Sequence, residues 1–127
     1  MTVRQRVGLP LLVLLAGVLS GCHSYRIHVV VENRTGAAIE LLEVDYPSAS
    51  FGLDKMAANA DYGYGFQVRG SGPVKVQYTE AASQKIRQMT GPEIFERQEG
   101  QLEIVLLPDG KAEFHPQLTA RPSVASR

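Results

Sequence analysis

Apolar and polar residues alternate with a period of two through most of the chain after residue 24. The clearest case is residues 25–32, in which Tyr25 and three β-branched residues at the odd positions share one face, and three of the four residues on the other face are polar. Such alternation predicts half-buried strands. It recurs in the segments 39–46, 62–68, 74–79, 101–107 and 111–115, with a weaker strand at 85–90 and a short edge strand at 50–53.

The segments between these strands are rich in turn-forming residues. Asn33-Arg34-Thr35-Gly36 predicts a turn that joins strands 25–32 and 39–46 into a hairpin. Gly70 to Pro73 is a strong breaker of regular structure. Residues 54–60 are expected to form a loop with one helical turn at most, and residues 91–100 a polar loop.

About seven or eight short strands without a long amphipathic helix predict an all-β fold, an antiparallel β-sandwich of the immunoglobulin-like or transthyretin-like kind. The Cys and Trp core signature of true immunoglobulin domains is absent, because the chain has one cysteine and no tryptophan. We expect residues 25–115 to form this domain and residues 116–127 to form a disordered tail.

The first 21 residues have the order of a secretory signal peptide. Arg4 and Arg6 precede an apolar stretch at 7–19, which ends in the small residues Ser20 and Gly21. A membrane-spanning helix needs about 20 apolar residues, so this shorter helix is expected to target the chain for export.

Leu19-Ser20-Gly21-Cys22 resembles the lipobox of bacterial lipoproteins. The resemblance implies cleavage between Gly21 and Cys22, with a lipid on the Cys22 thiol. Residues 22–24 would then be a short tether. The alternative is an ordinary signal peptide with a chance cysteine, which would leave an unexplained free thiol. His23 is not the aspartate associated with inner-membrane retention, which favours the periplasmic face of the outer membrane.

Removing residues 1–21 leaves 106 residues with 11 basic and 13 acidic side chains. This length is enough for one domain that buries about 65% of its unfolded surface. Nucleic-acid binding requires clustered positive charge, so the composition argues against a nucleic-acid partner.

Candidate catalytic and metal-binding chemistry is sparse. Three histidines, His23, His28 and His115, are far apart in sequence, and two of them could meet only if their strands place His28 and His115 on one face. Zinc sites usually have closely spaced Cys and His ligands, and hydrolases of the α/β class have a G-x-S-x-G elbow. We therefore predict no catalytic residue, no metal and no cofactor.

Aromatic residues alternate with glycines in the segment 62–68. Tyr62, Tyr64 and Phe66 share one face of the predicted strand, and this spacing predicts a buried face. The alternative is that Tyr62 and Tyr64 form a stacking platform for a peptide or a sugar.

The folded part resembles small exported β-sandwich lipoproteins of uncharacterised function. We expect a non-enzymatic binding or accessory module at the bacterial cell envelope, acting through a strand edge or loop on a membrane-adjacent protein. The alternatives are a small envelope hydrolase or metal-binding enzyme that uses His28 or His115, and a structural spacer.

Overall fold

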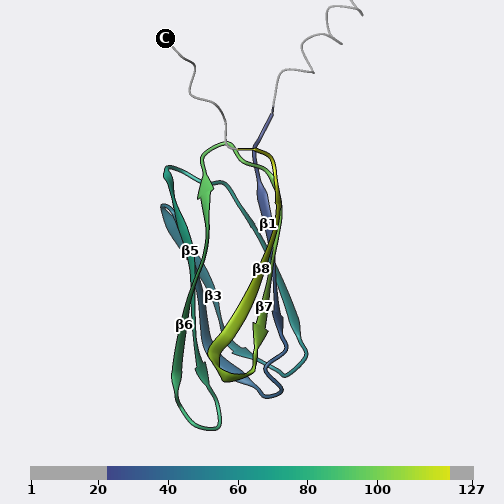
Figure 1. The fold of residues 1–127 in the computed structure, drawn as a ribbon, viewed down its shortest axis with the longest axis vertical. Coiled ribbons are helices and arrows are strands. Elements are labelled where there is room, and N and C mark those ends of the chain that lie inside the picture. The colour runs from purple at the N-terminus through teal and green to yellow at the C-terminus, as the bar shows by residue number, and fades with distance from the viewer. Residues whose placement is uncertain (1–22, 121–127) are drawn as a thin grey trace, which may run out of the picture.

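The computed structural model describes residues 23–120, which form two four-stranded sheets packed face to face (Figure 1). The first sheet, in spatial order, contains β4 (Asp61–Phe66), β1 (Ile27–Asn33), β7 (Gly100–Leu107) and β8 (Lys111–Leu118). The second contains β3 (Ala49–Met56), β2 (Ile39–Tyr46), β5 (Ser71–Glu80) and β6 (Ile86–Phe95). A single 3-10 turn, η1 (Pro108–Gly110), joins β7 to β8.

The predicted β-sandwich is confirmed. Every strand pair is antiparallel except β1 and β7, which run parallel. In immunoglobulin constant domains the first strand lies beside the second. Here β1 lies between β4 and β7, so the strand order is not that of an immunoglobulin constant domain.

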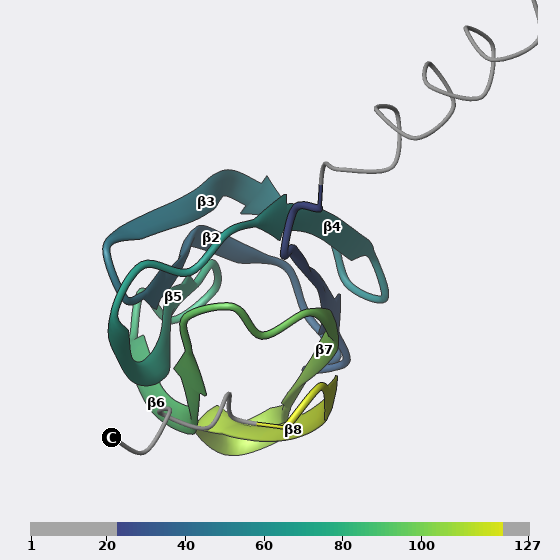
Figure 2. The same cartoon turned by 90° about the horizontal axis from the view of Figure 1, so that it is seen from above.

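The core lies between the two sheets and follows the alternation in the sequence. Ile27, Val29 and Val31 of β1 are buried against it, as are alternate residues of β7. The view along the strands shows both sheets surrounding this interior (Figure 2). The largest fully buried side chains are Tyr78, Ile27, Ile39, Ile94, Leu102, Ile104, Leu106, Val29, Val31, Val44, Val74 and Val76.

The predicted hairpin between the first two strands is wrong, because β1 and β2 belong to different sheets. Both sides of β1 are occupied by β4 and β7, so the chain after Asn33 must cross to the other sheet. Residues 34–38 form this crossing, and the turn predicted there is present.

Four strands continue through segments predicted to be irregular. β5 begins at Ser71, so it includes Gly72 and Pro73 of the predicted breaker. β6 runs through Gly91 and Pro92, so the predicted polar loop at 91–100 begins only after Phe95. β8 runs through Pro116 to Leu118, into the predicted tail. Both are edge strands, where proline is tolerated because one side of the strand needs no donor. β3 likewise includes residues 54–56, which were expected to be in a loop.

The two ends of the sandwich differ in what they carry. His23 and Ala120, the first and last described residues, lie at the same end as the loops 67–70 and 96–99, and we call this end the tether pole (Figure 1). The other end, the distal pole, carries the loops 34–38, 57–60 and 81–85. No helix within residues 23–120 is long and apolar enough to cross a membrane. The predicted signal-peptide helix, its cleavage site at Gly21 and Cys22, and residues 121–127 of the predicted tail lie outside the described residues.

Candidate functional site

Five aromatic rings gather where β3 and β4, one outer strand of each sheet, face each other, and we call this group the aromatic edge. Its members are Tyr46 of β2, Phe51 of β3, and Tyr62, Tyr64 and Phe66 of β4. Each sheet ends at this side of the sandwich without a further strand. On the opposite side β6 and β8 contact each other, and the Phe114 ring lies directly against Gly91.

The aromatic edge has a buried layer and an exposed layer. In the buried layer, Phe66 stacks on Tyr46 with ring centroids 3.8 Å apart and planes inclined by 8°. In the exposed layer, Tyr64 stacks on Phe51, with ring centroids 4.2 Å apart and planes inclined by 20°. Phe51 is 7% exposed whereas Tyr64 is 39% exposed, so one partner of the outer pair belongs to the core and the other to the surface.

The predicted buried face of residues 62–68 is therefore confirmed in part. Phe66 and Val68 are buried and Tyr62 is half-buried, but Tyr64 is exposed. The physical reason is that β4 and the facing β3 are both edge strands, so beyond the Phe51 ring no further strand of the described residues covers Tyr64. This exposure is what the alternative interpretation, a stacking platform, requires of Tyr64.

The edge strand β4 carries few of the residues that usually protect a sheet edge. Edges are usually blunted by charged residues, proline or bulges, which prevent pairing with other strands. β3 carries Asp54 and Lys55, β6 carries Pro92, and β8 carries Pro116. β4 has neither charge nor proline after its first residue, Asp61, but the Arg26 guanidinium donates a hydrogen bond to the Gly65 carbonyl oxygen at 3.2 Å.

The outer face of β4 is open at Gly63, whereas the side chains of His28 and Arg26 cover it at Gly65. A Cβ atom added at Gly63 would meet only the Val29 carbonyl oxygen, at 3.8 Å. The pKa of the Tyr46 hydroxyl is raised by burial and then by the neighbouring Tyr64 hydroxyl. The Tyr46 hydroxyl therefore stays protonated at neutral pH.

Sequence reasoning missed the contribution of β3 to this group. Phe51 fell in a segment predicted to be a short edge strand, but nothing in its spacing connected it with Tyr64. The two residues are 13 positions apart and in different sheets, so their contact depends on the topology.

A second candidate lies on the outer face of the first sheet, where a hollow of about 250 Å³ is lined by Val30, Glu32, Glu103, His115 and Gln117 among others. The pKa of the Glu32 carboxyl is raised, first by its hydrogen bond with the Glu103 side chain and then by burial. The His115 Nε2 atom lies 3.3 Å from a Glu113 carboxylate oxygen, and both side chains are more than half exposed.

The fold places His28 and His115 on one face, as a shared site would require, but not on neighbouring strands. His28 and His115 lie on the same sheet and the same outer face, but β7 separates their strands. His23 contacts Glu99 at 3.2 Å, at the tether pole. Within residues 23–120 no three His, Cys, Asp or Glu side chains are close enough to hold a metal ion.

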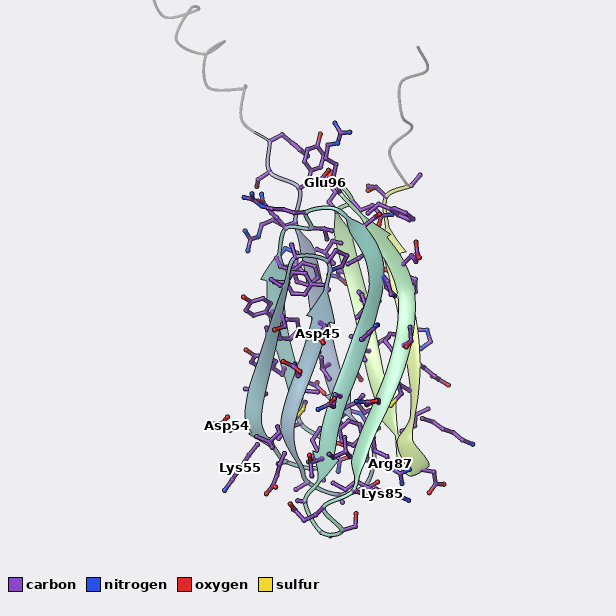
Figure 3. The ribbon with its side chains drawn as sticks, turned by 90° about the vertical axis from the view of Figure 1, so that its left-hand side faces the viewer. Asp45, Asp54, Lys55, Lys85, Arg87 and Glu96 are labelled. Atoms are coloured by element: carbon purple, nitrogen blue, oxygen red, sulfur yellow. The ribbon has the colours of Figure 1, made fainter. Side chains whose placement is uncertain are left out.

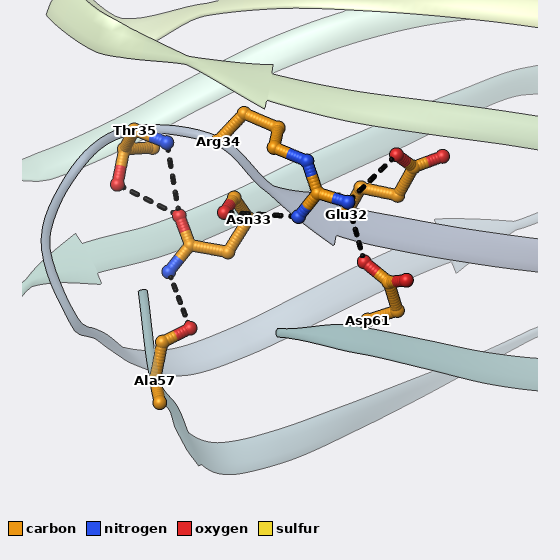
Figure 4. A network of polar contacts seen from close by, with 6 residues as sticks. All are labelled: Glu32, Asn33, Arg34, Thr35, Ala57 and Asp61. Carbon is orange, nitrogen blue, oxygen red and sulfur yellow. Dashed lines mark hydrogen bonds and ion pairs between the residues drawn. The ribbon is translucent and has the colours of Figure 1, made fainter. Parts of the chain in front are cut away.

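Asn33, which begins a glycosylation sequon in the sequence, has a structural role instead. Its side chain is fully buried, donates to the carbonyl oxygens of Ala37 and Ala57 at 2.9 and 3.0 Å, and accepts from the Thr35 hydroxyl at 2.7 Å (Figure 4). Arg34 beside it bridges Glu32 and Asp61 at 3.2 and 3.0 Å. This network fastens the crossing between the sheets.

Comparison with known proteins gives the fold alone. No protein-family model matches the chain, and no curated protein matches its sequence. A protein from Eubacterium rectale with a structure determined by NMR is similar in fold, with a TM-score of 0.54 over 76% of this chain and 95% of that chain. The two sequences are 9% identical, so the similarity extends to the sandwich architecture and not to a site.

Proposed function

We propose that this chain is a lipid-anchored, non-enzymatic binding module of a bacterial cell envelope, and that it binds an extended segment of a membrane-adjacent protein at the aromatic edge. The observation that carries this proposal is the edge of β4, open at Gly63, beside an exposed, stacked tyrosine. An extended peptide can add a strand to such an edge, with main-chain hydrogen bonds giving affinity and neighbouring side chains giving specificity.

The aromatic edge suits this mode of binding because its rings are held in place before a partner arrives. Phe51 and Phe66 are buried, so Tyr64 rests on a fixed surface and loses little freedom on binding. Tyrosines are enriched at binding sites because a large apolar ring is combined with one polar atom.

The membrane anchor rests on the lipobox-like residues Leu19 to Cys22 and on the absence of any other cysteine in the chain. Two or more acyl chains, at about 0.8 kcal/mol per buried methylene, hold a protein durably on a bilayer. A bacterial host fed with a labelled fatty acid should label the full chain, and Cys22→Ser should abolish the label. Label that persists in the serine variant would overturn the anchor.

The binding edge is tested with Gly63→Lys in the full, lipid-anchored chain, because a lysine on β4 opposes pairing with another strand. The matched control is Gln88→Lys, which places the same charge on the outer face of β6. We expect chemical cross-linking in intact cells to yield a product that Gly63→Lys loses and Gln88→Lys retains. Loss in both variants or in neither would overturn the proposed edge.

The enzymatic alternative has one observation in its favour, the hollow in which His115 lies near Glu32 and Glu103. A hydrolase of this kind would use the carboxyl pair and the imidazole for proton transfer. Its lining contains no Ser, Thr or Cys that could act as a nucleophile. The alternative predicts that His115→Gln abolishes a cellular phenotype that Gly63→Lys leaves intact.

A further inference from the structure

The tether pole contains a second hollow, of about 540 Å³, that the proposed binding edge does not use. It is lined by Tyr25, Gln67, Val68, Arg69, Glu96 and Arg97. These residues come from the segment before β1, the loop after β4 and the loop after β6, which the fold brings together at one end.

The two arginines of this hollow are free to bind an anion. Neither Arg69 nor Arg97 forms an ion pair with any residue in the range 23–120, and both are exposed. Arg97 also has a backbone φ of 68°, in the left-handed region that favours glycine. A long cationic side chain is thus present at a turn position where glycine would fit more easily.

The position of the hollow relative to the anchor restricts what it can meet. Only His23 and Ser24 separate Cys22 from Tyr25, one of the lining residues. At about 3.5 Å per residue, that connection spans at most about 10 Å. If Cys22 carries a lipid, Tyr25 cannot lie far from the phospholipid headgroups.

We infer that the tether pole docks on the bilayer itself, with Arg69 and Arg97 binding the phosphate of an anionic phospholipid and Tyr25 lying at the interface. Guanidinium groups match phosphate oxygens in geometry and charge, and tyrosine is enriched where one side of a protein meets the headgroups. The strands would then stand away from the membrane and present the aromatic edge along the side of the molecule. This inference rests on the proposed lipid anchor.

The orientation can be measured by energy transfer, because the chain contains no tryptophan and a single one can be introduced. Gln67→Trp places it at the tether pole and Ala82→Trp at the distal pole. The lipid-anchored protein is reconstituted in vesicles of phosphatidylethanolamine and phosphatidylglycerol containing a dansyl-labelled headgroup lipid. We expect several-fold more transfer from Gln67→Trp than from Ala82→Trp, and equal transfer would overturn the inference.

The role of the arginines is tested by Arg69→Gln with Arg97→Gln in the Gln67→Trp protein. The matched control is Lys55→Gln with Lys85→Gln, because both lysines lie at the distal pole, opposite Glu96 (Figure 3). Each cation near an anionic surface strengthens binding by about fivefold. Replacing both arginines should therefore lower the apparent affinity of the tether pole for the bilayer by roughly 30-fold. Its energy transfer should fall to the level seen in phosphatidylcholine vesicles, while that of the control stays unchanged.

Energy transfer that is unchanged in the arginine variant, or reduced equally in the lysine control, would overturn the phosphate contact. Mass spectrometry of the same preparation separates this result from failure of the anchor. A chain whose Cys22 carries no lipid would overturn the proposed function and, with it, this inference. A lipidated chain with equal transfer from both tryptophans would overturn the inference and leave the anchor standing.

Discussion

The ring of Tyr64 on β4 stacks on the ring of Phe51 on β3, with centroids 4.2 Å apart, and this contact bridges the outer strands of the two sheets. Phe51 is buried and Tyr64 is 39% exposed. Such pairs contribute about 0.5–1.5 kcal/mol beyond the area that they bury. Tyr64 therefore contributes modestly to the free energy of unfolding and offers one ring to the solvent.

We expect Phe66→Ala and Tyr64→Ala to differ sharply in stability. Phe66 is buried and stacked on Tyr46, so its removal should cost about 3–5 kcal/mol in the free energy of unfolding. Removal of Tyr64 should cost about 1 kcal/mol, because only its contact with the edge is lost. Thermal and denaturant melts measure both, with Tyr64→Phe as the control that keeps the ring. Equal losses from the two alanine variants would show that Tyr64 is a core residue.

The pH dependence of stability should reveal the carboxyl pair of the first sheet. The pKa of Glu32 is raised above its ordinary value of 4.5, so the protonated carboxyl favours the folded state. The stabilising contribution of the protonated Glu32 carboxyl is fully present below pH 4.5, and it is lost as the pH rises through the raised pKa. We expect Glu32→Gln to be more stable than the wild type at neutral pH and to show a flatter profile, as measured by melts from pH 4 to 8.

Glu80 provides the contrast for that experiment, because its pKa is lowered by hydrogen bonds from Ser83 and Arg87. Its contribution is present above the ordinary pKa and is lost as the pH falls through the lowered one. Glu80→Gln should therefore remove stability at neutral pH. If both glutamine variants changed the profile in the same direction, the interpretation of the Glu32 and Glu103 pair would be wrong.

Asn33→Ala tests the crossing between the sheets. The substitution leaves the carbonyl oxygens of Ala37 and Ala57 and the Thr35 amide without their partner in a partly buried place. A buried polar group without a partner costs about 1–3 kcal/mol. We expect a loss of about 1–3 kcal/mol in denaturant unfolding, whereas Asn59→Gly, at an exposed turn with a φ of 63°, should cost much less. A wild-type unfolding midpoint for Asn33→Ala would contradict this role.

A longer tether should weaken a function that depends on closeness to the membrane. A flexible Gly/Ser insertion of about 20 residues after Ser24 adds a root-mean-square span of roughly 25 Å. We expect the cellular cross-linked product to decrease in yield, since the aromatic edge would then sample a much larger volume. An inserted segment of the same length at the exposed Ala82, in the loop 81–85 of the distal pole, is the control. An unchanged product after the tether insertion would argue against a membrane-adjacent partner.

Much of the fold could be predicted because burial follows local alternation. β2 was predicted with its observed bounds, Ile39–Tyr46, and β7 to within one residue. A bulge between Glu40 and Glu43, with Leu41 at a φ of 51°, lets both Ile39 and Leu42 face the core. Period two alone would have put those two residues on opposite faces.

The errors came from residues whose meaning depends on neighbouring strands. Pro92 and Pro116 predict irregular structure locally, but each lies on an edge strand. Pro73 lies within β5 at a bulge in its pairing with β6. The sequence could not show that Tyr64 is exposed either, because its exposure depends on which strand covers β4.

The proposed binding edge is tested most directly by site-specific photo-cross-linking of the lipid-anchored chain in intact cells. A photoreactive phenylalanine analogue at Tyr64 places the reactive ring on the aromatic edge, and the same analogue at Ile86, which is 60% exposed on β6, is the control. We expect a discrete cross-linked product from position 64, which Gly63→Lys abolishes, and no such product from position 86. The same product from both positions, or from position 86 alone, would contradict the account.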